Sequence, residues 1–571
     1  MRFLPTTREE MRRLGWTEAD IILISGDTYI DSPYIGVALI GRVLMAAGFK
    51  TAVIAQPDIN STSDIGRLGS PRLFWGVSGG SVDSMVANYT ALKKRRRADD
   101  FTPGGQNTRR PDRAVIVYTN LIRKLQKETS RKSPIVLGGI EASLRRISHY
   151  DFWSNKVRRS ILFDARADIL LYGMAERTVV ELARALDEKG DFRTLAGLCY
   201  IGHEVPDDFT ELPPHKTVAV DKAAACRMFE EFYHNNDPLT AHGLAQLQDS
   251  RYLIQNPPAP YLHSEELDKI HELPFSREVH PYYKRHGTVR ALTTIQAAIT
   301  THRGCYGECN FCAIAVHQGR TVRSRSEESI LKEAAEISKQ PFFKGNILDV
   351  GGPTANMYGF ECARKLAKGP CRQRRCLVPA ICPNLKINHK RQVALLKKLR
   401  RLPGIKRVFV ASGIRYDMVM TGGYGREYLR EVVRHHVSGQ LKIAPEHCLD
   451  HVLTSMGKPM VKHLLEFKHL FDEESRKAGK PQFLTYYFIA AHPGCTLKDM
   501  RDLKDFCRRN LHITPEQTQI FTPTPSTYSA LMYWTGRDLK GDKIYCERDN
   551  RKKEAQKMVL LNRPQKAVHH D

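Results

Sequence analysis

The sequence has no uncharged apolar run of the ~20 residues that a membrane-spanning helix needs. Residues 1–10 also lack the apolar segment that an export signal carries. Together, these two absences predict a cytoplasmic protein that has no membrane partner.

Acidic residues are few relative to basic ones. The chain has 62 Asp and Glu against 88 Lys and Arg, which gives a formal net charge of +26. Such an excess attracts polyanions, so it favours RNA or an acidic protein as substrate, although a solvated basic surface is the plainer reading. No helix-turn-helix, RNA-recognition, Gly-x-Gly-x-x-Gly or Walker pattern accompanies the charge, so no nucleotide-binding class is indicated by a motif.

Cysteine is scarce in the first half of the chain and concentrated afterwards. Only Cys199 and Cys226 precede residue 300, whereas seven of the 13 cysteines lie between Cys305 and Cys382. An odd number of cysteines in a large chain without an export signal argues against a disulfide framework. The clustering therefore predicts metal binding. Packing or surface thiols are expected at Cys362, Cys448, Cys495, Cys507 and Cys546.

Short apolar strands alternate with helices in the first part of the chain. Near-continuous apolar strands separated by helices imply a parallel sheet that is covered on both faces. We expect strands at 21–24, 51–55, 114–117, 135–137 and 168–172, and a helix over 176–189. The proline-rich segment 256–260 breaks this pattern. The predicted division is an amino-terminal α/β domain over 1–250, a linker over 251–289, a second domain over 290–536 and a basic, mobile tail over 537–571.

The strand–helix alternation resumes in the second domain. We expect strands at 295–301, 347–350, 407–411, 440–444, 484–489 and 517–521. This order predicts a (β/α) barrel or partial barrel, in which the site lies at the carboxyl ends of the strands. Ser324 and Glu327 have the spacing of a capping box at the start of one of its helices. Polar or Gly/Pro chemistry follows most of the strands, at 351–353, 412–413, 445–447 and 492–494.

The strongest motif is the segment 304–312, with the spacing Cys-x3-Cys-x2-Cys at Cys305, Cys309 and Cys312. Three thiolates on one tight loop can each bind an iron of a cubane cluster, which leaves the fourth iron open. Gly304 and Gly307 are expected to supply the positive φ angles of such a loop. Zinc is the alternative metal, and a structural zinc site would have to recruit a fourth ligand from His302 or His317.

This spacing, the aromatic Phe311 before the third cysteine and the position after the first barrel strand resemble the radical S-adenosylmethionine (SAM) superfamily over about residues 290–530. The resemblance implies a [4Fe–4S] cluster on Cys305, Cys309 and Cys312, with SAM bound at the open iron. It also implies reductive cleavage of SAM to a 5′-deoxyadenosyl radical, which abstracts a hydrogen atom from a substrate that the sequence does not identify. A one-electron reductant such as flavodoxin or ferredoxin is the implied partner.

The match is closer than the superfamily, because residues 411–417, 441–447 and 487–494 resemble the YgiQ group of radical SAM proteins, as does the amino-terminal domain. What the resemblance implies is a set of SAM-binding residues: Phe311, Gly351, Gly352, Ser412, Arg415, Glu446 and His447. Proline replaces the usual glutamate after the two glycines, so only backbone contacts are carried over there. Local roles are the alternatives: Ser412 as a cap, Arg415 paired with Asp417, and His447 packed in the core.

The amino-terminal α/β domain resembles the cobalamin-binding arrangement, a Rossmann-like fold placed before the radical SAM barrel. The Asp-x-His-x-x-Gly signature of base-off cobalamin binding is missing, since the loop at residues 25–31 contains no histidine. Cobalamin is therefore expected to be unlikely.

A second cysteine group comprises Cys371, Cys376 and Cys382, with the spacing Cys-x4-Cys-x5-Cys. It is compatible with an auxiliary cluster or a zinc ion. The alternative is that residues 377–381 form the third barrel strand and that these thiols are incidental. The alternative function for the whole chain is a non-enzymatic zinc or nucleic-acid-binding protein.

Overall fold

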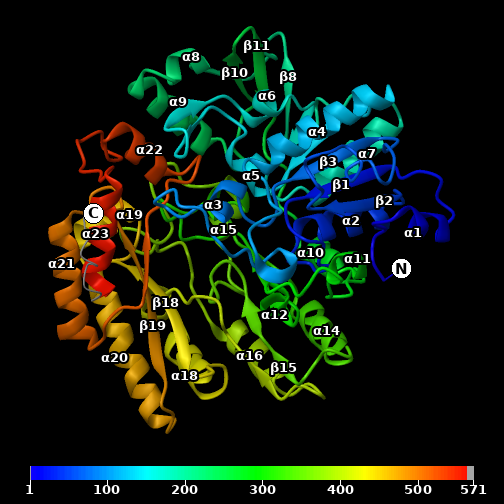
Figure 1. Cartoon of the computed structure of the whole chain (residues 1–571). Coiled ribbons are helices and arrows are strands. Elements are labelled where there is room, and N and C mark those ends of the chain that lie inside the picture. Colours follow the sequence, from blue (N-terminus) through cyan, green and yellow to red (C-terminus); the bar gives the residue numbers. More distant parts are fainter. Residues whose placement is uncertain (1, 562–571) are drawn as a thin grey trace, which may run out of the picture.

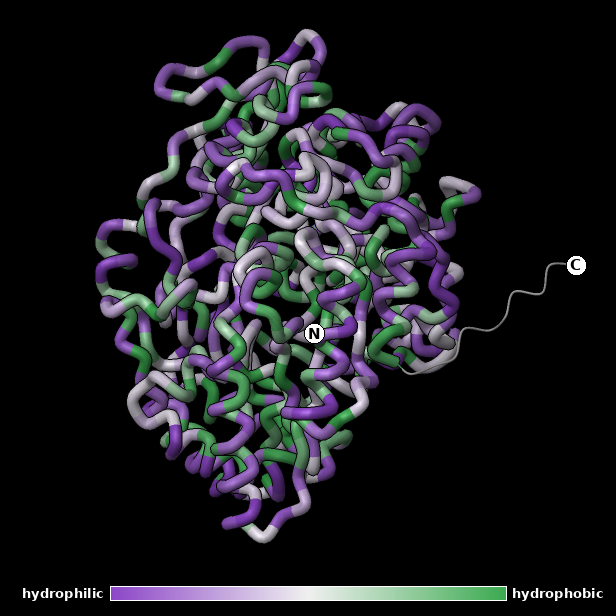
Figure 2. Tube along the Cα trace, turned by 90° about the vertical axis from the view of Figure 1, so that its left-hand side faces the viewer, coloured by the Kyte–Doolittle hydropathy of each residue, from purple (hydrophilic) through white to green (hydrophobic). Residues whose placement is uncertain are grey.

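The computed structural model describes residues 2–561. It contains two layered units, an amino-terminal sheet with its helices and a partial barrel below it in the view of Figure 1. Hydrophobic segments gather inside the units, and hydrophilic segments are frequent along the periphery (Figure 2). No helix within 2–561 is long and apolar enough to cross a membrane.

The amino-terminal unit is built on one nine-stranded sheet in the order β2-β1-β3-β4-β7-β8-β11-β10-β9. The first five strands in this order run parallel, as the buried apolar runs predict. The last four strands form a mostly antiparallel extension. The strands are β1 (Ile21–Ser25), β2 (Thr51–Ala55), β3 (Phe74–Ser78), β4 (Ile135–Gly138), β7 (Ile169–Leu171), β8 (Leu198–Gly202), β9 (Thr210–Leu212), β10 (Leu244–Gln248) and β11 (Arg251–Gln255).

One predicted strand of this unit is wrong. The segment 114–117 is the start of helix α4 (Ala114–Thr129), and its place in the sheet is taken by β3, which the sequence pattern did not reveal. The buried residues Val115, Tyr118 and Ile122 recur at helical spacing, so the apolar run at 114–117 is one face of a helix. The expected helix over 176–189 is confirmed as α7 (Glu176–Asp187).

The segment taken as a linker is folded. Strand β11 lies between β8 and β10, so the sheet continues beyond residue 250. Helices α10 (Ser264–His271) and α11 (Pro281–Lys284) follow within the same segment. Residues 251–289 therefore join the two units as a packed connection.

The second unit is a partial barrel whose strands pair in parallel. Its strands are β12 (Ala298–Thr300), β15 (Asn346–Ile347), β16 (Asp349–Gly351), β17 (Arg407–Val408), β18 (Gln440–Glu446), β19 (Phe483–Ala490) and β20 (Gln517–Ile520). Because β15 pairs directly with β17, no strand from 377–381 intervenes between them, and the reading of that segment as a third barrel strand is wrong. Residues 352–389 instead form a long excursion that starts at the carboxyl end of β16.

Helices cover the outside of the barrel: α14 (Glu327–Ser338), α16 (Lys390–Leu399), α18 (Gly425–His435), α20 (Val461–Lys477) and α21 (Leu497–Phe506). Helix α14 is capped by Ser326, whose hydroxyl accepts from the backbone N–H of Ser329. The predicted capping box of Ser324 and Glu327 is therefore wrong. The N-cap residue is Ser326, two residues later, and Ser324 ends strand β14 (Arg323–Ser324).

The described part of the carboxyl-terminal tail is anchored to the barrel. Helix α23 (Asn550–Leu561) packs against α21 and β20, and its Leu560 is fully buried. The side chain of Gln556 accepts a hydrogen bond from the backbone of Ala491 at 2.9 Å. The expectation of a mobile tail is wrong for residues 537–561, and residues 562–571 lie outside the described part of the chain.

A buried ion-pair group ties the connecting segment to both units. The backbone N–H of Arg277 donates to the carbonyl of Asp31 in the amino-terminal unit. Its guanidinium pairs with Glu333 on α14, and Glu333 also pairs with Arg325. All three charged side chains are almost fully buried. Glu333 is the carboxylate that the two cations share, and Asp268 lies 3.9 Å from the other side of Arg325.

We expect Glu333→Ala to destabilise the protein by about 3–5 kcal/mol, because it removes the carboxylate shared by two buried guanidinium groups and leaves Arg325 with only the more distant Asp268. Urea unfolding followed by circular dichroism measures the change. The matched control is Glu328→Ala, an exposed glutamate on the same helix. Equal unfolding midpoints for the two variants would contradict the role assigned to Glu333.

Candidate active site and iron–sulfur centre

The cysteine loop begins where β13 (His302–Arg303) ends, on the side of the barrel that faces the amino-terminal unit. Gly304 has φ +77°, and a Cβ atom there would lie 2.1 Å from the carbonyl oxygen of Thr321. Gly307 does not adopt a positive φ, so that expectation is wrong for this residue. Its missing side chain instead leaves room for sulfur, since a Cβ there would lie 3.2 Å from Cys305 Sγ and 3.7 Å from Cys309 Sγ.

The three thiols of this loop come together. The backbone N–H of Gly307 donates to Cys305 Sγ at 3.3 Å, and the backbone N–H of Cys312 donates to the carbonyl of Cys309. Burial, followed by the nearby sulfurs of Cys309 and Cys305, raises the pKa of Cys312 to about 12. The Cys312 thiol therefore keeps its proton until a metal displaces it.

The donor set of the loop is three thiols, which suits an iron–sulfur cluster that keeps one iron open. A structural zinc site needs four ligands, and none of the interactions described for His302 or His317 joins them to these sulfurs.

The barrel holds the loop through Asn310. Its backbone N–H donates to Met456 and its side-chain amide donates to Ser455, both at 2.9 Å. Its carbonyl accepts from the backbone N–H of Ser529 at 2.9 Å. The loop therefore does not depend on a bound cluster alone for its position.

Arg415 lies beside the cysteine loop. Its guanidinium donates two hydrogen bonds to Asp417, at 2.8 and 3.0 Å, and a third to Cys309 Sγ at 3.7 Å. Burial opposes the charge, but the neighbouring Asp417 and Cys309 raise the pKa of Arg415 above its usual range. The structure therefore shows both the pairing of Arg415 with Asp417 and a position beside the cysteine loop.

Gly351, Gly352 and Ser412 lie together at the ends of the barrel strands. The carbonyl of Gly351 accepts from the backbone N–H of Thr301 at 2.7 Å, so it is already engaged. A Cβ at Gly352 would lie 2.7 Å from the ring of His302, which explains the glycine there. The hydroxyl and backbone N–H of Ser412 donate to Asp349.

Nothing in the sequence pattern singled out Asp349, although a carboxylate inside an apolar strand was the available signal. Its side chain also accepts from the backbone N–H of Ala411 at 2.8 Å. Asp349 therefore fixes the turn that presents Ser412 to the site.

Glu446 and His447 differ in their surroundings. Glu446 is buried with φ +70°, and Lys458 Nζ lies 3.7 Å from its carboxylate. The same lysine lies near Cys312. His447 is fully buried and its Nδ1 accepts from the backbone N–H of Leu449, so it is a packed core residue. Phe311 is half-buried and meets the ring of His492 edge-on at 6.2 Å.

A cavity of about 510 Å³ lies between the two units and opens onto these strand ends. On the barrel side it is lined by His302, Asp349, Gly352, Pro353 and Ser412. On the other side lie the carboxyl ends of β1, β3 and β4, which is where open parallel sheets bind their ligands. The exposed lining is chiefly apolar, and charged side chains from both units, among them Asp27, Glu176, Arg303 and Asp349, also border it.

His271 is an unpartnered polar group on this cavity. Its side chain is 5% exposed, and neither ring nitrogen has a hydrogen-bond partner within the described residues. Burial, followed by the cations Arg325, Arg303 and Arg277, lowers its pKa well below the usual value. The imidazole is therefore neutral and free to bond to a ligand.

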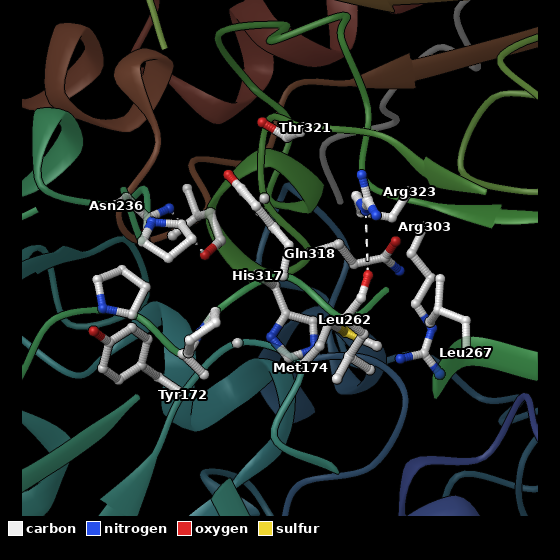
Figure 3. A pocket seen from close by; sticks show the side chains of 18 residues that line it. Tyr172, Met174, Asn236, Leu262, Leu267, Arg303, His317, Gln318, Thr321 and Arg323 are labelled. Carbon is white, nitrogen blue, oxygen red and sulfur yellow. Dashed lines mark hydrogen bonds between the residues drawn. The ribbon is translucent and has the colours of Figure 1, made fainter. Parts of the chain in front are cut away.

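A smaller hollow of about 80 Å³ adjoins the cavity (Figure 3). The two spaces share Met174, Arg303, His317 and Gln318. His317 is hydrogen-bonded to Ser143 of the amino-terminal unit at 3.0 Å. These side chains therefore form the partition between the hollow and the cavity.

Cys371, Cys376 and Cys382 lie in the excursion after β16, around a separate hollow next to the cysteine loop. Cys362, taken from the sequence as a packing thiol, lines the same hollow.

We expect Gly304→Ala to lose most of its iron after anaerobic reconstitution. The side chain adds about 1–3 kcal/mol of backbone strain and a clash with Thr321, both of which displace the first cysteine. Iron and sulfide content per chain measures the effect. Gly190→Ala, in an exposed turn with ordinary φ, is the control, and unchanged iron in Gly304→Ala would refute the prediction.

We expect Arg415→Gln to lower the reduction potential of the bound cluster by tens of millivolts, where 59 mV is about 1.4 kcal/mol for one electron. A cation beside a cluster thiolate stabilises the reduced, more negative state. Electron paramagnetic resonance during a redox titration measures the shift. Arg430→Gln, at an exposed ion pair, is the control, and Arg415→Lys should shift the potential less.

Comparison with known families gives matches over most of the chain. Residues 3–298 match the model described as Radical SAM N-terminal, and residues 299–507 match the Radical SAM superfamily model. A UPF0313 protein of Fusobacterium nucleatum is 56% identical over 565 residues, which cover 99% of each chain. A UPF0313 protein of Thermotoga neapolitana is 48% identical over 552 residues, which cover 96% of each chain.

Two solved structures are distantly similar to the chain. TsrM of Kitasatospora setae, a radical S-adenosylmethionine methyltransferase, is 16% identical with a TM-score of 0.48, covering 90% of this chain and 78% of that one. OxsB, a cobalamin-dependent S-adenosylmethionine radical enzyme, is 14% identical with a TM-score of 0.47, covering 90% and 55%.

The expectation that cobalamin is unlikely is contradicted by these neighbours. TsrM is described with cobalamin and a [4Fe–4S] cluster bound, and OxsB with aqua-cobalamin bound. The expectation depended on the missing histidine in residues 25–31. That absence removes one possible cobalt ligand, but it removes neither the domain nor the cavity at its strand ends.

The expected combination of a Rossmann-like amino-terminal domain and a radical SAM partial barrel is confirmed. The alternative of a non-enzymatic zinc or nucleic-acid-binding protein is set aside by the family matches. The chain is a radical SAM enzyme and belongs to the UPF0313 family, the YgiQ-type group that its sequence resembles.

Proposed function

We propose that this enzyme cleaves SAM reductively at a [4Fe–4S] cluster held by Cys305, Cys309 and Cys312, to abstract a hydrogen atom from a substrate in the interdomain cavity. The observation that carries the proposal is that the cysteine loop follows His302 and Arg303, which line the cavity. Cys305 Sγ also lies 3.6 Å from the hydroxyl of Thr354, which follows Pro353 of the cavity wall. When bound, the cluster supplies the electron and the open iron at which SAM is held.

The residues of the chain do the binding and orienting. Ser412 and the backbone of Gly352 border the cavity next to the loop, and we assign them to SAM. Arg415 and Lys458 place positive charge beside Cys309 and Cys312, which favours the thiolate form that iron requires. His447 has its nitrogens engaged within the core, so we assign it a packing role.

The cavity itself supports a ligand of ordinary small-molecule size, since its ~510 Å³ falls within the range of such sites. A chiefly apolar ligand with one hydrogen-bonding group suits the lining and the neutral imidazole of His271. A macromolecular substrate would have to insert one group into this space. RNA or an acidic protein as substrate, and a cytoplasmic location, stay predictions from the charge and the sequence.

The electron has to come from a one-electron donor, and we propose flavodoxin or ferredoxin for this partner. The Arg303–Glu176 ion pair, at 2.5 Å, links the units at the cavity wall.

The test is anaerobic reconstitution with iron and sulfide, reduction with dithionite in the presence of SAM, and chromatography for 5′-deoxyadenosine. We expect the wild-type protein to form it and the Cys305/Cys309/Cys312→Ala variant to give only background, because that variant cannot hold the cluster. Cys226→Ala, on the amino-terminal unit, is the control and should match the wild type.

SAM binding is measured on the same samples by equilibrium dialysis, with aquacobalamin as a second probe ligand for the cavity. A protein that takes up only zinc, or a fully loaded protein that neither binds nor cleaves SAM, would contradict the proposal. Retention of aquacobalamin would add cobalamin to the cofactors of the enzyme.

A further inference from the structure

Four cysteines surround one small hollow in the excursion that follows β16. Cys362, Cys371, Cys376 and Cys382 line it. Cys362 and Cys382 are buried, and the other two are partly buried. Cys376 lies within electrostatic range of both Cys362 and Cys382, so the sulfurs are neighbours in space although 20 residues separate the first from the last.

Cys362 joins the other three cysteines of this group only in the folded structure. Cys362 precedes helix α15 (Ala363–Lys368), and its backbone N–H donates to the hydroxyl of Tyr306 at 3.3 Å. Tyr306 belongs to the first cysteine loop and is fully buried. The two cysteine groups are therefore packed against each other through this tyrosine.

Positive charge is gathered at the hollow. Lys365 is 2% exposed, and its Nζ lies 3.7 Å from Cys376 Sγ. Arg364 donates a hydrogen bond to Cys371 Sγ at 2.5 Å. Buried cations beside sulfur stabilise thiolates. Only one carboxylate, Glu308, lines the hollow with these cations, so an anionic group is needed to balance them.

The ligand set narrows the choice of metal. Four thiolates without a nitrogen or oxygen ligand suit zinc or an iron–sulfur cluster. A [4Fe–4S] cluster spreads four thiolates over four irons, whereas a zinc ion gathers all four at one centre, so the iron and zinc contents separate the two.

We infer that Cys362, Cys371, Cys376 and Cys382 bind a second [4Fe–4S] cluster. Each thiol gives up its proton to solvent as it binds one iron. With four cysteine ligands no iron is left open, so this cluster does not chelate SAM and its chemistry is limited to holding or passing electrons. Its position beside Glu308 of the first loop, where Arg375 donates to the Glu308 carbonyl at 3.1 Å, suits transfer to the first cluster.

The test is the iron and sulfide content of the full chain after anaerobic reconstitution, with the Mössbauer and electron paramagnetic resonance spectra. We expect about eight irons per chain in the wild type and about four in the Cys305/Cys309/Cys312→Ala variant. The Cys362/Cys371/Cys376/Cys382→Ser variant should also hold about four, and it should still bind SAM. Cys546→Ala, a partly buried thiol elsewhere, should leave the content unchanged.

Uptake of no iron, or of one zinc ion, by the Cys305/Cys309/Cys312→Ala variant would overturn the inference. That variant leaves the second group intact, so the result does not depend on whether the fourfold variant folds. If the fourfold variant is unfolded by circular dichroism, Cys371→Ser replaces it, and altered spectra of the second cluster are then expected. SAM cleavage by the wild type is read separately, so the failure of one proposal does not imply the failure of the other.

Discussion

The close approach of Gly304 to the carbonyl of Thr321 is the contact on which the site depends. With a Cβ only 2.1 Å from that oxygen, no other residue fits without movement of the loop. From this point the chain turns through Cys305, Cys309 and Cys312, and Asn310 fastens the turn to the barrel. Strain at the first position is thus balanced by three hydrogen bonds at the loop's centre.

Buried arginine and lysine side chains lie beside several of the cysteine sulfurs. Buried thiols prefer to stay protonated, and cluster binding requires them as thiolates. Arg415, Lys458 and Lys365 each place a cation beside one of these sulfurs. Part of the basic excess of the chain therefore works inside the protein, and the net charge of +26 is not only a feature of its surface.

The amino-terminal unit contributes one wall of the cavity. The carboxyl ends of its parallel strands face the carboxyl ends of the barrel strands, so one space is shared by two sheets. The buried group of Arg277, Glu333 and Arg325 and the pair of Arg303 with Glu176 hold the two units together. A ligand in this space contacts both units at once.

The sequence alone was enough for the cofactor class, because three cysteines at fixed spacing are a local feature that no distant contact has to complete. It was also enough for the barrel strands and for β1, β2, β4 and β7, because buried parallel strands appear in a sequence as apolar runs. It did not predict β3 or the mostly antiparallel extension β8–β11. It misplaced residues 114–117, where an apolar run is equally compatible with a helix face. It also wrongly predicted a mobile tail up to residue 561, because the few buried side chains of the helix there do not recur at a clear helical spacing.

Only the tertiary structure could decide which distant residues share a site. Asp349 reaches Ser412, Cys362 joins Cys371, Cys376 and Cys382, and His271 reaches the cavity, each across a long stretch of chain. The physical reason is that a motif consists of residues close together in the sequence, whereas a cavity is lined by residues from several strand ends that only folding brings together. The sequence by itself determined which metal chemistry the chain carries, and the fold decided where that chemistry is directed.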